Sequence, residues 1–573
     1  MRAELALALA LGMAPAARAH QDRFMFGAND LARGGGARPV RLSMRATAAR
    51  AAMVELGRAV GVEANMQLGR PAPTPGPAAR AAPGGDRMRL AAVSATVFNL
   101  MIGTGAFCLP ASAVGVPVPL ALCVICALGV ASAGTFVLLG QLIARTGART
   151  FDELWRLSGP PVRALPSLLQ LVVAVYSVGT LVQYQVSLGE LLAPATRELF
   201  AACGARAAWL LAGANRCAVL LSAPLLLVGL LRFRDLPALT PASVVGVLAK
   251  AFSAALLVLR ALDGSYAHGG VFHDGSAAAF AAAAAAATTA PAGALGGGAL
   301  GGGALGASSA RLAVEAGMAD AGAAMSLVAA SSTAFMCHLD IPSYYAQLER
   351  PSARRFGYAA GAAFAAGTAV YCTIVVASRA LFGDSVASFA LSSFSPADGF
   401  ARAAQLLTAL GVFCSYMLTM LALKTTLATG QLGELLASLL GGDARERCVR
   451  RGAPLAATAH ALGASRRADT RLTLCVFALT TGLALCAASN LLFVVALRGA
   501  FLGTALTYAV PALIGLGLSG GLVRSAEGAH ETAEQRLWRR AGERSRPALW
   551  ALLASGCATM ALATGAVLHK FSR

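Results

Sequence analysis

The chain has 573 residues, of which 57% are hydrophobic and 13% charged, and its mean hydropathy is +0.66. This composition is too apolar for a soluble protein, and the chain is too long for a single membrane anchor, so a polytopic membrane protein is predicted. The formal net charge of +20 does not indicate a nucleic-acid partner, because the arginines flank apolar segments and are not interleaved with aromatic residues.

Residues 1–88 are rich in Arg, Ala and Pro and have no sustained hydrophobic periodicity, which predicts a disordered basic extension. Within it, a short apolar run from Leu5 to Leu11 precedes an Arg-rich, acid-poor stretch, a combination typical of a targeting leader. An unprocessed cytosolic tail is the alternative interpretation. Residues 89–570 form the predicted membrane domain.

About eleven membrane-spanning helices are predicted, because each needs about 20 predominantly apolar residues. They fall at 92–115, 117–143, 165–192, 215–231, 239–262, 322–346, 357–382, 401–427, 471–489, 491–519 and 547–568. Residues 264–321, between the fifth and sixth spans, include an alanine run and repeats of GGGAL, and are predicted to be a low-complexity loop. The distribution of Lys and Arg between the loops predicts a cytoplasmic N-terminus.

The first span reads AVSATVFNLMIGTGAFCLP over residues 92–110, with Asn99, Gly103, Thr104 and Gly105 near its middle. An interrupted helix at membrane depth frees backbone N–H and C=O groups, which are tolerated where they line a polar cavity. The glycines permit an unwound turn. The sequence therefore predicts one half of a binding site here, with the Gly-Thr-Gly segment contacting the substrate.

The sixth span carries a second polar interruption. Ser331, Ser332 and Thr333 are followed by Phe335, and farther on Pro342 removes a backbone donor and is expected to disturb the helix. If the domain consists of two five-helix repeats, the first and sixth spans occupy corresponding positions, and such paired interruptions indicate a transporter site. The substrate is then predicted to contact these two serines, the threonine and the phenylalanine. Close packing of small residues is the alternative interpretation.

An α-amino acid fits the chemistry of such a site. Half-helix N-termini favour a carboxylate, while unwound carbonyl groups accept an ammonium or coordinate a cation. Both charged groups lie on one carbon of an amino acid, so two facing interruptions can bind it from opposite sides.

Several blocks of the chain resemble one known family. Asn99, Leu100, Gly103 and Gly105 are similar to its opening motif, and the block FMCHLDIPSYYAQL over residues 335–348 resembles its Phe-x-Cys-His block. The family is that of the amino acid/auxin permeases, the transmembrane amino acid transporters, and the sodium-coupled neutral and vacuolar branches are the most similar. The resemblance covers about residues 90 to 570.

This resemblance implies an all-α integral membrane fold: an inverted-repeat, leucine-transporter-like bundle of five plus five helices, with one extra C-terminal helix. It implies secondary active transport of small, neutral amino acids by alternating access, coupled to Na⁺ or H⁺. In sodium-coupled relatives a first-span Asn and an eighth-span hydroxyl bind the cation. Asn99 matches the first, and Thr408, Ser415 and Thr419 lie near the position of the second, with Thr408 taken as the candidate. His338 and Glu190 are candidates for proton coupling, with purely structural roles as the alternatives.

No metal-ligand spacing and no nucleophile beside a base occurs in the spans, so an enzyme is not predicted, nor any cofactor besides the coupling ion. The predicted partners are the amino acid and the lipid bilayer, either of the plasma membrane or of a vacuole or another organelle. Cys203 and Cys217 bracket a polar loop, and either a disulfide or two free thiols is consistent with the sequence. A non-transporting amino acid sensor that uses the same pocket is the alternative function.

Overall fold

The computed structural model describes residues 89–158, 165–202, 213–232, 240–267, 269–272, 307–428, 466–488, 490–525 and 533–572. The predicted extension at 1–88, the GGGAL repeats and Cys203, whose pairing with Cys217 the sequence left open, lie outside these residues. The helices are α4 (Leu90–Met101), η3 (Thr104–Cys108), α5 (Leu109–Ser112), α6 (Val118–Thr146), α7 (Phe151–Leu157), α8 (Leu165–Ala202), α10 (Ala214–Arg232), α11 (Thr240–Asp263), α13 (Ala307–Ala334), η5 (His338–Asp340), α14 (Ile341–Gln347), α15 (Ala353–Phe382), η6 (Gly383–Ser385), η7 (Ala390–Ser393), α16 (Gly399–Ala428), α20 (Arg466–Ala487), α21 (Leu491–Arg498), η8 (Gly499–Gly503), η9 (Ala505–Ala509), α22 (Val510–Ser525) and α23 (Ala533–Ser572).

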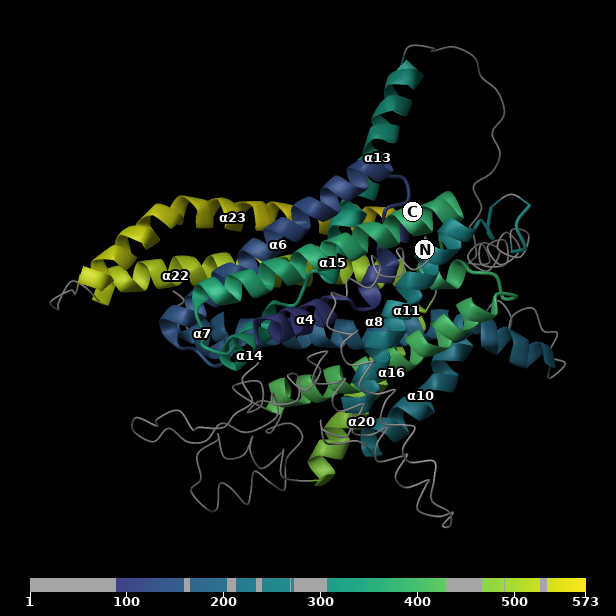
Figure 1. Cartoon of the computed structure of the whole chain (residues 1–573), viewed down its shortest axis with the longest axis horizontal. Coiled ribbons are helices and arrows are strands. Elements are labelled where there is room, and N and C mark those ends of the chain that lie inside the picture. The colour runs from purple at the N-terminus through teal and green to yellow at the C-terminus, as the bar shows by residue number, and fades with distance from the viewer. Residues whose placement is uncertain are drawn as a thin grey trace, which may run out of the picture.

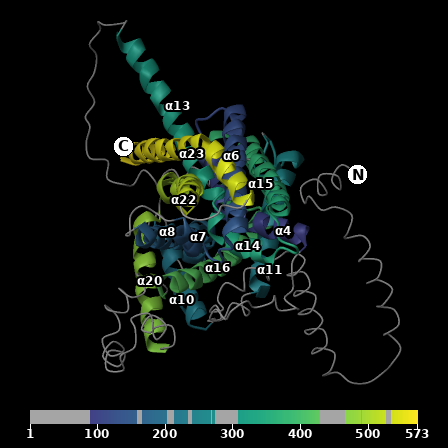
Figure 2. The same ribbon diagram turned by 90° about the vertical axis from the view of Figure 1, so that its left-hand side faces the viewer.

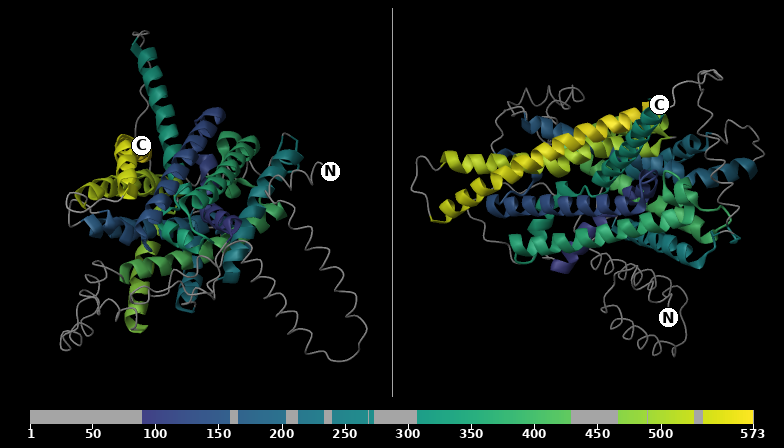
Figure 3. Two further views of the ribbon diagram at one scale, coloured as in Figure 1. Left: turned by 60° about the vertical axis from the view of Figure 1, so that its left-hand side comes forward. Right: turned by 90° about the horizontal axis from the view of Figure 1, so that it is seen from above.

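The long helices pack side by side in one bundle (Figure 1). In this bundle α6 packs against α15, while α16 packs against both α8 and α11. Figure 2 looks along α22 and shows α20 from its side, so these two helices cross steeply. At one edge α22 and α23 lie next to each other, which Figure 3 shows from above.

Nine helices of the described residues are long and apolar enough to cross a membrane, and the bent pair of α4 with η3 and α5 makes a tenth. The fifth predicted span corresponds to α11, a helix of 24 residues that carries the three charged side chains Lys250, Arg260 and Asp263. Every predicted span therefore coincides with one helix or with consecutive helical segments of the described residues. The predicted all-α membrane fold is confirmed.

Large apolar side chains cover the outside of the bundle. Leu225 and Val228 of α10 are 64% and 63% exposed, and Val130 of α6 is 75% exposed. Lone exposed apolar residues are common on soluble proteins. Here they recur along helices that are long enough to span a bilayer, and they suit a surface that faces lipid.

Local sequence signals set the ends of the long helices. Helix α6 has a proline in its first turn and stops at Gly147, whose φ of 69° is readily adopted by glycine. Helix α15 starts after Ser352, whose hydroxyl accepts a hydrogen bond from the Arg355 N–H at 3.2 Å, and it stops at Gly383 with a φ of 57°. These caps give helices of 29 and 30 residues.

Helix α13 differs from the sequence-based prediction at its start. It begins at Ala307, inside residues 264–321, which the sequence analysis assigned to a loop. The segment after residue 306 is rich in Ala and contains Arg, Leu and Glu, which favour helix, and it lacks the glycine triplets of the preceding repeat. The segment therefore continues α13 as helix, and this beginning of α13 projects away from the other helices (Figures 1 and 2).

Candidate functional site

The first predicted interruption is present in the structure. Helix α4 ends at Met101, η3 starts at Thr104, and the two parts of the span are bent by 48°. Between them Gly103 has extended backbone angles, with φ −100° and ψ −167°. The regular helical hydrogen bonds stop at this point, so backbone groups become available in the middle of a membrane span.

The sixth span is interrupted as well, at Phe335 to Cys337, between α13 and η5. Pro342 lies in the first turn of α14, a position where a missing N–H costs nothing. From the sequence, this proline was expected to disturb the helix. It instead begins the helix that follows, and the break lies upstream, next to the hydroxyl-rich residues.

The two breaks touch each other. A Cβ added to Gly105 would lie 3.6 Å from the Cα of Ala334, the last residue of α13. From α15, the buried Tyr371 hydroxyl lies 2.6 Å from the Met101 carbonyl oxygen and 2.9 Å from the Ala334 carbonyl oxygen. A hydroxyl has a single proton to donate, so at any moment it satisfies one of the two carbonyls that end α4 and α13.

A polar side chain of α8 faces the first break. The Gln183 amide donates from Nε2 to the Thr104 hydroxyl at 3.1 Å, and its Oε1 is buried without a hydrogen-bond partner. Thr104 is itself buried, as predicted for a residue of the site. The amide oxygen therefore keeps an acceptor free beside the start of η3.

The hydroxyl groups near the second break have different surroundings. Ser331 is fully buried and its hydroxyl has no partner, whereas Ser332 donates to the Val328 carbonyl at 2.9 Å within α13. Thr333 donates to the Val495 carbonyl of α21 at 3.0 Å. Of the three, Ser331 keeps an unused hydroxyl inside the bundle, and Thr333 instead attaches α13 to α21.

Phe335 belongs to an aromatic cluster next to this break. Its ring centroid lies 5.0 Å from that of Tyr371 and 6.2 Å from that of Phe364. Phe335 is completely buried. It therefore packs against Tyr371, whose hydroxyl lies within hydrogen-bond distance of both breaks. Contact of Phe335 with the substrate stays a prediction.

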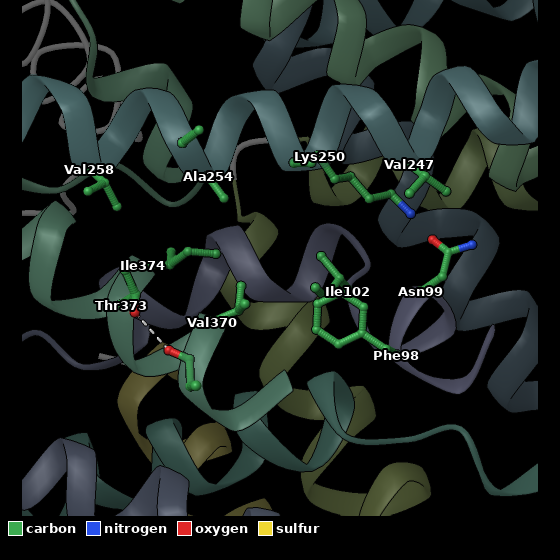
Figure 4. Close-up of a pocket in the computed structure, with 13 residues that line it drawn as sticks. Phe98, Asn99, Ile102, Val247, Lys250, Ala254, Val258, Val370, Thr373 and Ile374 are labelled. Atoms are coloured by element: carbon green, nitrogen blue, oxygen red, sulfur yellow. Dashed lines mark hydrogen bonds between the residues drawn. The ribbon is translucent and has the colours of Figure 1, made fainter. Parts of the chain in front are cut away.

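A cavity of about 180 Å³ lies beside the first break (Figure 4). A water molecule needs roughly 10–15 Å³ of such space, so the cavity has room for several waters or a small solute. Its walls come from α4, α11 and α15, and it is lined by Phe98, Asn99, Ile102, Val247, Lys250, Ala251, Ala254, Ala255, Val258, Ala369, Val370, Thr373 and Ile374.

Two polar side chains of this cavity face each other. Figure 4 shows the Lys250 ammonium directed toward the Asn99 amide. No carboxylate among the described residues forms an ion pair with this lysine. The predicted cation ligand Asn99 thus lies next to a cationic side chain that the protein itself supplies.

The second predicted cation ligand lies elsewhere. The Thr408 hydroxyl of α16 is 2.8 Å from the Ser253 hydroxyl of α11, and Thr408 is not among the residues that line the cavity. Asn99 and Thr408 are therefore held by different neighbours. Their joint binding of a sodium ion stays a prediction.

The two candidates for proton coupling lie outside the contact between the breaks. The buried His338 has Nε2 2.9 Å from the Thr135 hydroxyl and 3.2 Å from the Ser132 carbonyl, both in α6, while its Nδ1 has no partner. Glu190 accepts a hydrogen bond at 3.3 Å from the Asn215 amide of α10. These contacts join helices, and a coupling role for either residue stays a prediction.

Four residues of this region were missed by the sequence analysis: Gln183, Lys250, Tyr371 and Arg498. A signal was present for two of them, because an ionisable residue inside a membrane span marks a functional site by default. Lys250 and Arg498 lie within the predicted spans 239–262 and 491–519. The glutamine and the tyrosine give no comparable signal, since such residues are common in packed bundles.

Part of the chain is similar to a known family of membrane transporters. Residues 306–528 match the model of a family described as transmembrane amino acid transporter protein. A search of curated proteins finds no match. One solved structure, a nucleobase-cation-symport-1 family transporter in a closed conformation with bromovinylhydantoin bound, is 12% identical, with 84% of this chain and 92% of that chain covered and a TM-score of 0.39.

The family match confirms the resemblance over residues 306–528, without distinguishing among branches of the family. That family is described as one of membrane transport. The matched segment includes the second break and Tyr371, but it starts after the first break.

Proposed function

We propose that this chain, whose residues 306–528 belong to the transmembrane amino acid transporter family, is a secondary active transporter of small, neutral amino acids. One observation carries the proposal: two helices far apart in sequence break at the same place, and Tyr371 lies within hydrogen-bond distance of the carbonyls that end both of them. Carbonyl groups shared in this way accept the ammonium of an amino acid when the hydroxyl turns to one of them.

The small residues at the contact favour a small substrate. Gly105 packs against Ala334 and Thr333, with only 3.6 to 3.8 Å available to an added Cβ. Opening this contact creates space between the breaks without exposing either to lipid, because α8 and α15 cover them. Alternating access then consists of opening the contact toward one side of the membrane at a time.

Protons are the proposed coupling ion. The cavity next to the first break already contains the Lys250 ammonium directed toward Asn99, and a sodium ion there would be repelled by it. A lysine can also bind and release a proton, which an asparagine cannot. Ile102 of the first break lines the same cavity. Protonation of Lys250 therefore changes the charge directly beside that break.

The test is uptake of labelled alanine into proteoliposomes with Na⁺ and H⁺ gradients imposed separately. We expect accumulation under a pH gradient alone and none under a sodium gradient alone. In the Lys250→Met variant the pH gradient loses its effect while alanine exchange continues. The matched control is Lys424→Met, because Lys424 is ion-paired with Asp469 at 2.5 Å and lines no part of the cavity beside the first break.

Three results would contradict the proposal. Accumulation driven by Na⁺, with Asn99→Ala needing far more sodium for half-maximal uptake, would favour the sodium-coupled alternative. Unchanged proton coupling in Lys250→Met would remove the lysine from the mechanism. Binding of amino acids without any flux would support the sensor.

A further inference from the structure

Arg498 is an arginine buried in the bundle without a carboxylate beside it. It is the last residue of α21 and is 8% exposed. No acidic side chain in the part of the chain that the structure describes forms an ion pair with it. Buried charges are ordinarily paired, because removing a charge from water is costly. An unpaired guanidinium in a membrane span therefore requires a reason.

The hydrogen bonds of Arg498 leave one side of the guanidinium unused. Among the described residues Thr180 alone accepts a hydrogen bond, from Nη1, and the Nε–H is buried without a partner. The guanidinium also lies over the ring of Tyr176, 4.7 Å from its centroid, which supplies part of the missing stabilisation. The edge formed by Nε and Nη2 is the edge that binds a carboxylate with two parallel hydrogen bonds.

This arginine is connected to the first break through one face of α8. Thr180 and Gln183 are three residues apart and so share a helix face. Gln183 in turn donates to Thr104, the first residue of η3. Gln183 Oε1 and Arg498 Nε are both buried without a partner, and both side chains meet this polar face of α8.

Arg498 is also tied to the second break. The following residue, Gly499, packs so closely on α13 that an added Cβ would lie 1.9 Å from the Ala329 carbonyl oxygen and 2.3 Å from the Thr333 hydroxyl oxygen. The backbone of Arg498 therefore cannot move independently of α13. Its side chain extends from this contact to Thr180 of α8.

We infer that Arg498 binds the carboxylate of the transported amino acid; this rests on the proposed transport function. The carboxylate neutralises the guanidinium, and the ammonium on the same carbon remains for the carbonyls of Met101 and Ala334. A zwitterion then adds no net charge to the bundle, in agreement with a neutral substrate. The arginine would give the site its preference for amino acids over amines of the same size.

The experiment measures competition with labelled alanine uptake in proteoliposomes by unlabelled alanine, alaninamide and ethylamine. In the wild type we expect alaninamide and ethylamine to compete roughly 100-fold more weakly than alanine, because they leave a buried charge unpaired. In Arg498→Gln, alanine uptake efficiency falls by a similar factor, and alanine and alaninamide become equivalent competitors. Arg402→Gln, at an exposed arginine paired with Glu198, is the control and keeps the wild-type ranking.

A second variant separates the loss of carboxylate binding from the effects of misfolding. Arg498→Lys keeps the charge but loses the paired donors, so a loss of roughly tenfold with partial discrimination is expected. Thermal unfolding in detergent verifies that each variant is folded. If Arg498→Gln or Arg498→Lys kept full discrimination between alanine and alaninamide, the arginine would be structural and the inference wrong.

Other outcomes separate this inference from the function on which it rests. Absence of amino acid uptake and binding in the wild type would overturn both. Uptake of alanine with equal competition by alaninamide would overturn the inference alone. A wild type that prefers glutamate, with only glutamate uptake lost in Arg498→Gln, would assign the arginine to a side-chain carboxylate and contradict its pairing with the α-carboxylate.

Discussion

Two largely buried arginines of this bundle have opposite surroundings. Arg260 at the end of α11 donates from Nε and Nη2 to the two Asp398 oxygens, at 2.9 Å each, and from Nη1 to Asp263 at 2.7 Å. Tyr266 donates to Asp398 at 3.2 Å. Arg498 has a threonine and an aromatic ring but no carboxylate among the described residues.

The difference separates a structural cluster from a site. The Asp398 carboxylate also accepts from the Phe400 and Ala401 N–H groups, so it caps α16 while it holds α11. In that cluster, both Asp398 oxygens and the Arg260 guanidinium therefore have hydrogen-bond partners within the protein. Around the breaks, in contrast, Arg498, Gln183 and Ser331 each have an unused polar atom. Such atoms destabilise a bundle unless a ligand uses them.

The largest expected effect comes from breaking the structural cluster. Asp398→Asn removes the buried charge that pairs with Arg260 and leaves the guanidinium with Asp263 as its remaining carboxylate, which costs up to about 3–5 kcal/mol. We expect a large drop in the thermal unfolding midpoint in detergent. Glu198→Gln, in the half-exposed pair with Arg402, should cost about 0–1 kcal/mol. Similar drops for the two variants would refute the structural role of Asp398.

The next effect concerns the contact between α13 and η8. Gly499→Ala places a Cβ 1.9 Å from the Ala329 carbonyl oxygen, so backbone must shift, at a cost of about 1–3 kcal/mol. We expect a lower unfolding midpoint together with a loss of alanine uptake. Gly357→Ala is the matched control, since its Cβ would have an ordinary contact of 3.6 Å with Val137, away from the breaks. Wild-type uptake by Gly499→Ala would show that this contact is not needed for transport.

A smaller effect is expected at the tyrosine between the breaks. Tyr371→Phe removes one hydroxyl and leaves the Met101 and Ala334 carbonyls without it, at a net cost of about 0.5–1.5 kcal/mol. Because these carbonyls are the proposed ammonium ligands, the half-saturating alanine concentration should change more than the unfolding midpoint. Tyr358→Phe, at an exposed tyrosine of the same helix, is the control. Unchanged alanine affinity would contradict the role of Tyr371.

Much of the fold could be predicted because a bilayer imposes a length on apolar helices. The first break was also predictable, since Gly103 and Gly105 lower the helix propensity of a stretch in which Asn99 and Thr104 add polar groups. The second break was predicted in the correct span but for the wrong local reason. Pro342 begins α14, and helix α13 ends at Ala334 without any proline or glycine at its end.

The rest of the site depends on contacts between distant parts of the chain. Tyr371 reaches Met101 across 270 positions, and Arg498 reaches Thr180 across 318. No periodicity or motif encodes such pairings. The charge of Arg498 within an apolar span was the signal that could have been used, but its lack of a carboxylate partner becomes visible only when the helices are packed.

The central claim is that the unsatisfied polar groups around the breaks bind the amino acid, and one measurement tests it most directly. It is the thermal unfolding midpoint in detergent of wild type and Arg498→Gln, each with and without saturating alanine. We predict that alanine raises the wild-type midpoint, since a ligand at 100 times its dissociation constant adds about 2.7 kcal/mol. Arg498→Gln should unfold near the wild-type midpoint without alanine and gain far less than the wild type from the same alanine concentration. A drop as large as that of Asp398→Asn, or an undiminished rise with alanine, would contradict the account.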